Sequence, residues 1–396
     1  MAFTHTFIAE TKSDYRGCHN AHHHAGVLYA ALPDIDLTVV HIYRSDNLGV
    51  TWTILTTHPR AGEFNKCDYY IKSSGIHALT YGYGGPAAWH YVTFDGANWS
   101  SPEIWYAAVR TFGGMVPDLE DEEPHINFGR RWGGKYITRK GGSWGAVENT
   151  SPGVQGAGGG PSIAMRPNNE PTLSAYNDIT PAQHRIYDRT DGVWTVSLEE
   201  EPGLLVRRPE SERMWLLTSS GVPYRQYESV YYRDGSGTGG WTLDNTFVPA
   251  DFGKYGTGSN CVGRDILVTS RGEVFMFIDA YSRTNIDNSL FVVKRNTDGS
   301  WESPVCIFAG SSLVGRAVTG GGVSAVQNPV GGWGVVWKKY DVPLDRYEWW
   351  WSASEDLVID PDIKPEEKPI WRTVRVADAG RHPRNTGREV RSGINE

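Results

Sequence analysis

Asp95-Gly96-Ala97-Asn98-Trp99-Ser100-Ser101-Pro102-Glu103-Ile104 has a near copy further along the chain, Asp298-Gly299-Ser300-Trp301-Glu302-Ser303-Pro304-Val305-Cys306-Ile307. Asp-Gly before an aromatic residue is typical of a tight turn that leads into a strand. Related turns lie before Trp52, Trp144, Trp194 and Trp241, and a seventh position, without the glycine turn, falls in Glu348-Trp349-Trp350-Trp351. The steps between these tryptophans, up to Trp351, are 47, 45, 50, 47, 60 and 50 residues, and such a spacing is typical of a four-stranded blade.

A second repeat lies upstream of several of these turns. Lys72-Ser73-Ser74-Gly75 separates two apolar runs, and equivalent hairpins begin at Met165, Val268 and Gln327. Each segment has a strand, a tight Gly or Asn turn and a second strand, as a β-hairpin requires. Because the two signals alternate in a fixed phase, we predict an all-β chain with a single β-propeller of seven four-stranded blades. A two-sheet sandwich with an accessory domain is the alternative.

The repeats also predict the domain organisation. Residues 1–360 form the propeller, with blades that start near residues 14, 62, 107, 155, 203, 258 and 315. Residues 361–396 supply a linker, a closing strand and a polar tail, which we expect to contact a protein partner. Spare strands at Phe3–Glu10 and Ile370–Ala377 are both candidates for closing the ring, so that no sheet edge stays open.

Composition limits the class of protein. The content of 46 Gly, 22 Pro and 12% aromatic residues fits many short strands joined by turns. The net charge of −8 argues against a general nucleic-acid surface, and no apolar run reaches the ~18 residues of a membrane span. The N-terminal residues lack the basic and apolar regions of a signal peptide. We therefore expect a virion-associated or cytoplasmic protein, extracellular only by a non-classical route.

The cysteines leave three interpretations open. Cys18, Cys67, Cys261 and Cys306 are far apart and form no Cys-x-x-Cys pair. They are buried reduced thiols, or include one disulfide, or Cys18 joins a metal site with the neighbouring histidines.

One turn carries a family resemblance. Ser45-Asp46-Asn47-Leu48-Gly49-Val50-Thr51-Trp52 resembles the Asp-box of the bacterial neuraminidase repeat, Ser-x-Asp-x-Gly-x-Thr-Trp, with Asn47 where the family has Asp. The resemblance implies a sialidase-like β-propeller, in which Ser45, Asn47, Gly49 and Trp52 close the turn between the third and fourth strands. In such propellers this turn lies opposite the usual active site, so the resemblance implies a fold and not an activity.

Proteins with such repeats include sialidases, polysaccharide lyases, sugar-binding lectins and virion or tail adhesins. The Arg-Ile-Pro motif of sialidases is missing near the start, where the first arginine is Arg16 in Tyr-Arg-Gly-Cys. The individual family is therefore not identified, and sialidase activity is not expected.

Candidate ligand-binding residues gather where the second strand meets the third, and where one blade leads into the next. Both connections open on the face where propellers usually bind ligands. Aromatic rings beside Asp and Arg suit a saccharide, because rings stack on sugar faces while charged groups bind hydroxyls or a uronate; the alternative is ordinary loop ends. The candidates are Tyr83, Trp89, Asp178, Arg225, Asp279, Tyr281, Arg316, Tyr340 and Asp341, with Asp14, Tyr15, Arg16, His184, Tyr224, Arg264, Arg283 and Arg346 nearby.

The histidine cluster is the densest unusual feature. His22 and His24 share one face of an extended strand, and with His19 or Cys18 they are candidates for a zinc-type site. A general base and packed or solvated histidines are the other two interpretations. In a polysaccharide lyase, His22, His24, His90, His125 or His184 would abstract the proton next to a uronate, and Arg264 or Arg283 would neutralise its carboxylate.

An acidic run covers residues 118–123. It is either a calcium site or a solvated loop, and no other cofactor is expected.

Three functions fit the sequence. The first is a non-enzymatic propeller in a larger assembly, such as a phage virion or tail protein that binds a surface glycan. The second is a carbohydrate-active enzyme, a lyase on a uronate-containing polysaccharide, and the third is an intracellular interaction scaffold. The expected partners are a glycan or acidic polysaccharide and proteins of an assembly, without nucleic acid or a membrane span.

Overall fold

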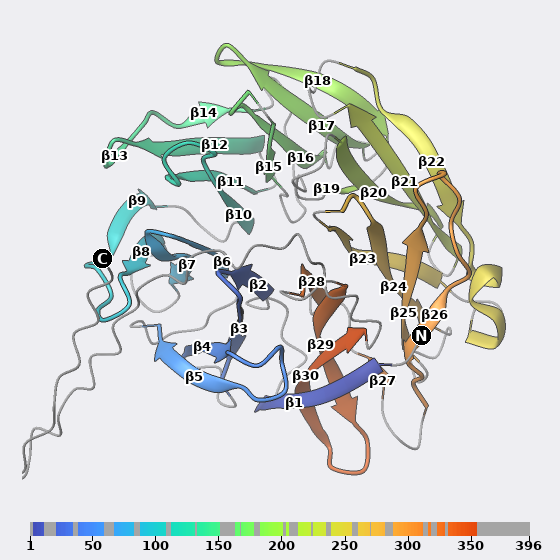
Figure 1. Ribbon diagram of the computed structural model, residues 1–396. Coiled ribbons are helices and arrows are strands. Elements are labelled where there is room, and N and C mark those ends of the chain that lie inside the picture. The colour runs from blue at the N-terminus through green and yellow to red at the C-terminus, as the bar shows by residue number, and fades with distance from the viewer. Residues whose placement is uncertain are drawn as a thin grey trace, which may run out of the picture.

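The structure is a computed structural model. It describes residues 3–11, 21–34, 39–58, 67–82, 88–107, 112–130, 133–150, 163–166, 168–177, 183–200, 203–205, 213–222, 225–234, 239–255, 260–269, 271–281, 288–311, 316–317, 323–328 and 332–354. These residues form seven antiparallel sheets arranged as the blades of a ring (Figure 1). The prediction of an all-β, seven-bladed β-propeller is confirmed.

The first three blades follow one another in chain order. Their strands are β2 (Ala21–His24), β3 (Val27–Pro33), β4 (Val40–Ser45) and β5 (Thr53–Thr57) in blade 1; β6 (Cys67–Lys72), β7 (Gly75–Gly82), β8 (Ala88–Phe94) and β9 (Glu103–Ala107) in blade 2; and β10 (Phe112–Pro117), β11 (Pro124–Arg130), β12 (Gly133–Lys140), β13 (Ser143–Trp144) and β14 (Glu148–Asn149) in blade 3.

The next three blades repeat this order. Their strands are β15 (Ile163–Met165), β16 (Pro171–Asn177), β17 (Gln183–Thr190) and β18 (Val193–Glu200) in blade 4; β19 (Gly203–Leu205), β20 (Arg213–Val222), β21 (Arg225–Asp234) and β22 (Thr242–Phe247) in blade 5; and β23 (Asn260–Val268), β24 (Val274–Tyr281), β25 (Ser289–Arg295) and β26 (Val305–Phe308) in blade 6. A 3-10 turn, η1 (Pro249–Tyr255), lies between blades 5 and 6.

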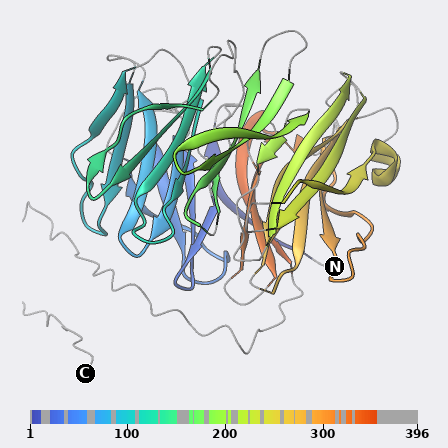
Figure 2. The ribbon, with the colours of Figure 1, turned by 90° about the horizontal axis from the view of Figure 1, so that it is seen from above.

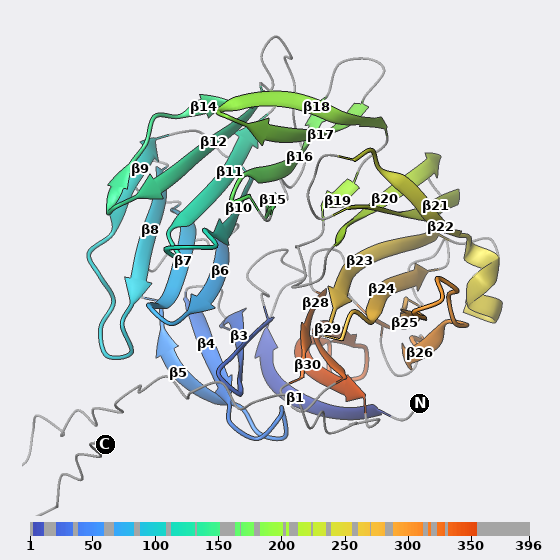
Figure 3. The same ribbon diagram turned by 45° about the horizontal axis from the view of Figure 1, so that its top comes forward.

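Blade 7 joins the two ends of the propeller. It contains β27 (Arg316–Ala317), β28 (Val323–Gln327), β29 (Trp333–Asp341), β30 (Arg346–Ser354) and, as its outermost strand, β1 (Phe3–Thr11). Strand β1 runs antiparallel to β30, from Phe3 opposite Ser354 to Thr11 opposite Tyr347 (Figure 3). The N-terminal candidate is therefore the strand that completes this sheet, while residues 361–396, with the C-terminal candidate, lie outside the described residues.

This closure explains the seventh tryptophan position, which lacks a glycine turn. Trp349, Trp350 and Trp351 lie in β30, the third strand of blade 7, and the fourth strand comes from the other end of the chain. A turn between the third and fourth strands is therefore not needed there.

The strands connect two faces of the ring (Figure 2). We call the lower face the end that carries the turns between first and second strands and between third and fourth strands. The upper face is the end at which second strands lead into third strands and each blade leads into the next. The turn of Ser45 and Trp52 therefore belongs to the lower face.

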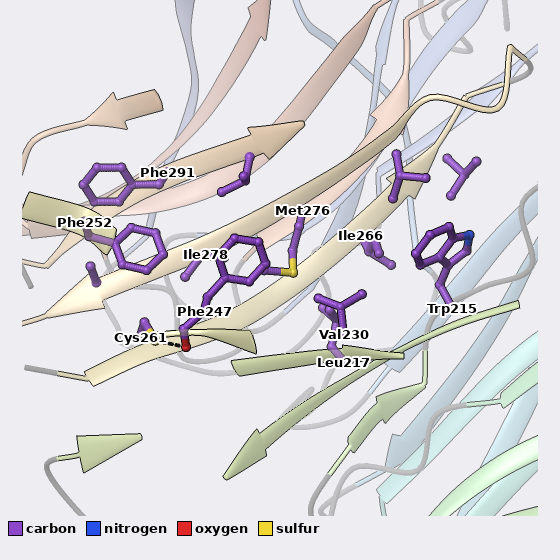
Figure 4. Close-up of a cluster of buried hydrophobic side chains, with 14 residues drawn as sticks. Trp215, Leu217, Val230, Phe247, Phe252, Cys261, Ile266, Met276, Ile278 and Phe291 are labelled. Atoms are coloured by element: carbon purple, nitrogen blue, oxygen red, sulfur yellow. Dashed lines mark hydrogen bonds between the residues drawn. The ribbon is translucent and has the colours of Figure 1, made fainter. Parts of the chain in front are cut away.

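Apolar side chains on alternate positions of each strand fill the space between blades. Between blades 5 and 6, Trp215, Leu217 and Val230 pack against Met276 and Ile278 (Figure 4). Burial of each such side chain contributes roughly 1.5–3 kcal/mol. The repeated tryptophans therefore act first as packing residues between blades.

A polar clamp on the lower side joins several pairs of blades. In blade 3, the Arg139 guanidinium donates to the Glu103 carboxylate of blade 2 at 3.2 Å, and the Trp144 indole Nε1 donates to the same carboxylate at 2.8 Å. Equivalent clamps join Arg189 and Trp194 to Glu148, and Arg295 and Trp301 to Asp244. Charge-assisted hydrogen bonds of this kind fix the angle at which neighbouring blades pack.

The turn that resembles an Asp-box is closed by its own side chains. The Ser45 hydroxyl accepts from the backbone N–H of Gly49 at 2.8 Å, and the Asn47 side-chain oxygen accepts from the N–H of Thr51 at 2.9 Å. Gly49 has a φ of +89°, and a Cβ there would lie 2.0 Å from Nε1 of Trp351. Glycine is therefore required by both the backbone conformation and the close approach of blade 7.

Candidate functional site

A β-bulge interrupts the innermost strand of blade 6. The register of β23 against β24 shifts between Gly263 and Asp265, so Arg264 is the extra residue. A Cβ on Gly263 would lie 2.6 Å from Oε1 of Glu228 in blade 5, while Oδ2 of Asp265 accepts the backbone N–H of Ala325 in blade 7 at 2.7 Å. Neighbouring blades therefore hold the bulge from both sides, and bulges of this kind redirect a side chain.

The redirected side chain forms a two-point ion pair. Arg264 Nε and Nη2 donate to Asp279 Oδ1 and Oδ2 at 3.0 and 2.7 Å. Asp279 lies toward the upper end of β24, on the same side of the strand as Phe277, whose ring lies 5.2 Å from that of Trp333 in blade 7. The Asp279 side chain is 1% exposed and that of Arg264 is 22% exposed, so the buried carboxylate holds a guanidinium that solvent can reach.

Blade 7 places a second pair on its side of the same interface. Nζ of Lys339 lies 2.6 Å from Oδ2 of Asp341. Both residues lie on the same face of β29 as Trp337, and this face is directed at blade 6. Asp341 Oδ1 also accepts the N–H of Leu344 at 3.2 Å. Burial acts to raise the pKa of Asp341, but the hydrogen bonds from Lys339 and Leu344 hold this pKa below its ordinary value.

Strand β27 connects the two blades at this end. Arg316 and Ala317 pair with Tyr340 and Lys339 of β29, and the N–H of Ala317 donates to the carbonyl of Asn288 in blade 6 at 2.9 Å. Because β27 contacts both blades, it ties their upper ends together. We call Arg264, Asp279, Lys339, Tyr340 and Asp341 the rim of blades 6 and 7.

The hairpin of β29 and β30 completes this region. The Tyr340 hydroxyl donates to Oδ1 of Asp345 at 2.5 Å, and the Tyr340 and Tyr347 rings lie 4.9 Å apart at 49°. Arg346 donates to Glu348 at 2.8 Å and also contacts Glu10 of β1. The upper end of blade 7 therefore carries aromatic, acidic and basic side chains held in defined positions.

The structure describes the side chains of only some of the predicted ligand-binding residues. It places Asp279, Tyr340, Asp341, Arg264 and Arg346 at the rim or next to it. Trp89 is wholly buried in the core between blades 2 and 3, so we leave it out of the ligand surface. For His184, Arg225, Tyr281 and Arg316 only the strand positions are described, and Asp14, Tyr15, Arg16, Tyr83, Asp178, Tyr224 and Arg283 lie outside the described residues.

The histidine cluster lies at a turn of the lower face. His22, His23 and His24 lie in β2, and Nε2 of His23 accepts the N–H of Gly26 in the following turn at 3.2 Å. His19 and Cys18 lie outside the described residues, and within the described part of the chain no group of three or more His, Cys, Asp or Glu side chains has the arrangement of a metal site. His23 therefore stabilises the turn, and the role of His22 and His24 stays a prediction.

Two other histidines form buried hydrogen bonds near the lower face. His77 Nδ1 lies 2.5 Å from the hydroxyl of Tyr91, and its Nε2 lies 2.8 Å from the hydroxyl of Ser74. His125 contacts Tyr136 at 2.5 Å and Asp118 at 3.0 Å in the same way. Burial lowers the pKa of His77 to about 4 and also lowers the pKa of His125. Both side chains are therefore neutral at pH 7, and they stabilise blades 2 and 3.

The acidic run is engaged by protein groups. Asp118 accepts from Asn169 at 2.7 Å, Glu122 accepts from the hydroxyl of Ser74 at 2.8 Å, and Glu123 accepts from Arg139 at 2.6 Å. These carboxylates join the lower turns of blades 2, 3 and 4. A calcium ion at this run stays a prediction.

Of the cysteines, Cys261 and Cys306 are in the thiol state, and Cys261 is buried, with its Sγ donating to the carbonyl of Phe247 at 3.3 Å. Among the described residues, no helix is both long and apolar enough to cross a membrane.

Several residues at or beside the rim of blades 6 and 7 carry no signal in the sequence. Lys339 and the bulge residues Gly263 and Asp265 lie in no local pattern that marks them. The clamps do leave a signal, because Arg139 and Arg189 precede their tryptophans with four residues between them, and Arg295 precedes Trp301 with five.

Comparison with known proteins shows the class of fold. No family model and no curated protein matches the sequence. Among solved structures, one of two prolyl endopeptidases matches with a TM-score of 0.52 and 11% identity, over 90% of this chain and 51% of that chain. The SapL1 lectin in complex with alpha methyl fucoside gives 0.46 and 11% over 76% and 98%, and the GH93 alpha-L-arabinofuranosidase of Fusarium graminearum gives 0.46 and 10% over 77% and 97%. At such identities the likeness concerns the fold alone, and no Asp-box family is shown.

Proposed function

We propose that this chain is a non-enzymatic glycan-binding β-propeller that uses its upper face, and that it works within a larger assembly such as a phage virion or tail. The bulge that fixes Arg264 against Asp279 is the observation that carries the glycan part of the proposal. A guanidinium held by a buried carboxylate loses little conformational entropy on binding a polar ligand.

The division of polar groups between the faces supports this location. On the lower side, Arg139, Arg189 and Arg295 donate to carboxylates of the preceding blades. At the upper side, charged pairs lie on two adjacent blades, and the hairpin that follows the Lys339–Asp341 pair exposes the apolar side chains of Val342 and Leu344. Sugar recognition needs such a combination, because hydroxyls require donors and acceptors while the C–H face of a sugar packs on an apolar or aromatic surface.

Saccharide binding by the full chain tests the glycan part. Titration calorimetry against neutral and acidic oligosaccharides should detect binding, and Arg264→Ala should weaken it by about tenfold, or roughly 1.4 kcal/mol. Arg44→Ala is the matched control, since Arg44 also donates through two nitrogens, to Asp46 at 2.9 and 2.6 Å, but on the lower face. Absence of binding to every saccharide, or equal loss in both variants, would overturn the proposal.

Uronate-containing polymers test the absence of catalysis. When they are incubated with the chain, no new unsaturated ends that absorb ultraviolet light should appear. The appearance of such ends would replace this proposal by the lyase alternative, with Arg264 as the residue that neutralises the carboxylate.

The assembly part rests on the sequence. Residues 381–396 are rich in polar and charged side chains, and we propose that they contact another protein. Removal of residues 361–396 should leave the propeller folded and its saccharide affinity unchanged while it abolishes association with other components of the particle.

A further inference from the structure

We infer that the upper end of blade 7 selects neutral saccharides over uronates, with neighbouring sugar hydroxyls bridging Lys339 and Asp341. This inference rests on the proposed function and names the ligand class. It concerns the hairpin of β29 and β30, which the structure describes without a gap from residue 332 to 354.

The charges of this hairpin disfavour an anionic ligand. Among the side chains that the structure describes, the upper end of blade 7 holds four carboxylates, in Glu10, Asp341, Asp345 and Glu348, and each accessible cation contacts one of them. Lys339 binds Asp341 at 2.6 Å, and Arg346 binds Glu348 at 2.7 Å and also contacts Glu10. A uronate would therefore meet described side chains that carry no excess positive charge and would be repelled by the nearby carboxylates.

Lys338, the third cation described in this region, points away from the Lys339–Asp341 pair. Lys338 is buried, with 2% of its surface exposed, and its ammonium lies 5.4 Å from the ring centres of Tyr347 and Trp349. Successive side chains of a strand point to opposite faces, so Lys338 lies on the side of blade 1 and not on the side of the Lys339–Asp341 pair.

A neutral sugar fits the same groups. A hydroxyl is both a donor and an acceptor, so one hydroxyl can accept from the Lys339 ammonium while its neighbour donates to the Asp341 carboxylate. The side chains of Lys339 and Asp341 are 15% and 12% exposed, and such partly buried charges form strong hydrogen bonds with neutral partners. The pair thus offers complementary groups without an unbalanced charge.

The tip of the hairpin adds an apolar surface. Val342, Pro343 and Leu344 are three consecutive exposed residues, with Val342 at 40% and Leu344 at 56%. A run of exposed apolar residues is unfavourable in water unless it contacts a ligand. The bonds from Tyr340 to Asp345 and from Leu344 to Asp341 hold this tip in one conformation. The C–H face of a sugar ring can pack on it without an ordering cost for the hairpin.

Matched saccharide pairs test the inference. Calorimetry with the full chain compares galactotriose with trigalacturonate, mannotriose with trimannuronate, and cellotriose with triglucuronate, which differ chiefly in a hydroxymethyl or carboxylate group. In at least one pair the neutral member should bind about tenfold more tightly or better. Its affinity should change less than about twofold between low and high salt, because a neutral ligand is not screened.

Variants then assign the site. Asp341→Asn should weaken binding of the neutral sugar by about tenfold and narrow the difference from the uronate, and Lys339→Met should weaken it to a similar extent. Glu273→Gln is the matched control, since Glu273 pairs with Lys294 at 2.7 Å on the lower side of blade 6, and it should leave the affinity unchanged. Circular dichroism and thermal unfolding establish that each variant is folded.

The outcomes separate this inference from the proposed function. Tighter binding of the uronate member, with strong weakening by salt, would overturn the inference and leave a glycan-binding propeller. Neutral binding that is unchanged in both folded variants would also overturn it. Failure of every saccharide to bind would overturn both.

Discussion

Replacement of Arg233 by methionine should be among the most damaging single changes in the described part of the propeller. Arg233 in blade 5 donates through Nη1 and Nη2 to the two carboxylate oxygens of Asp188 in blade 4 at 2.6 and 2.7 Å, and through Nη2 to the hydroxyl of Thr172 at 2.7 Å. The side chains of Arg233 and Asp188 are 0% and 9% exposed. Methionine fills part of the volume but supplies none of these donors.

The expected loss follows from the carboxylate that remains. In Arg233→Met, Asp188 keeps the hydroxyl of Thr172 at 2.6 Å but loses both guanidinium bonds. Breaking a buried ion pair from one side costs about 3–5 kcal/mol, because an uncompensated charge stays buried. Arg44→Met removes an ion pair whose Asp46 partner is 63% exposed, and it should cost about 0–1 kcal/mol.

The pH dependence provides an independent check. In the native protein burial acts to raise the pKa of Asp188, but the Arg233 bonds hold this pKa below its ordinary value. Asp188 therefore stabilises the fold above its unfolded pKa, and this contribution disappears as the pH falls through the folded pKa. In Arg233→Met the folded pKa should instead rise above the unfolded value, since only desolvation and weaker partners remain. The penalty of the variant should then shrink as the pH is lowered from 7 toward 4.

Urea unfolding followed by tryptophan fluorescence measures both effects. The midpoint and slope at pH 7 and pH 5 give the free energy of unfolding for the native chain, Arg233→Met and Arg44→Met. A loss below about 1 kcal/mol for Arg233→Met, or a penalty that is equal at both pH values, would refute the argument that Asp188 depends on Arg233.

Three further predictions concern other parts of the ring. Gly49→Ala should destabilise the protein by about 2–4 kcal/mol, through left-handed strain and a clash with Trp351. Gly26 has a φ of +77° and no atom within 4 Å of an added Cβ, so Gly26→Ala should show the strain alone. Equal losses of unfolding free energy for the two variants in denaturant would contradict the clash. Burial lowers the pKa of His77 to about 4, so His77 is neutral in the folded protein. Its contribution to the free energy of unfolding is complete above pH 6.5 and is lost as the pH falls toward 4, with a slope of about 1.4 kcal/mol per pH unit. His77→Gln should reduce this slope in urea titrations, and an unchanged slope would show that other groups cause it. Deletion of residues 1–11 should expose the edge of β30 and promote aggregation, measured by light scattering, and a monomeric deletion variant with native unfolding would contradict the role of β1 in closing the ring.

The fold could be predicted because its signals are local and repeated. Each Asp-Gly or Gly-Gly turn before a tryptophan reports a nearby hairpin, and such turns need only backbone conformations that a few residue types allow. The spacing of these turns then predicts the number of blades. The choice between two closing strands could not be made in this way, since the pairing of Phe3 with Ser354 is a contact between distant parts of the sequence.

The candidate site was less accessible to prediction. Asp279, Tyr340 and Asp341 could be predicted because they lie near strand ends at an identifiable face. Trp89 follows the same rule of position, yet its ring points into the core, because a shift of one residue along a strand reverses the direction of a side chain. The bulge at Arg264 depends on Glu228 and Ala325 in two other blades, and a local pattern does not contain that information.

The pairing of β1 with β30 has a consequence for synthesis of the chain. His5 and Ser352, which are hydrogen-bonded at 2.7 Å, are 347 residues apart in sequence. Strand β1 is translated before the other strands of the propeller and must therefore remain without its native partner until translation has passed residue 354. During that time β1, with an apolar Ile8 that is 9% exposed in the finished ring, is open to pairing with strands of other nascent chains. Closure of the ring therefore requires blade 7, which is translated after the other six blades, to capture a strand that was translated before them. Slow translation of blade 7 would prolong the time at risk.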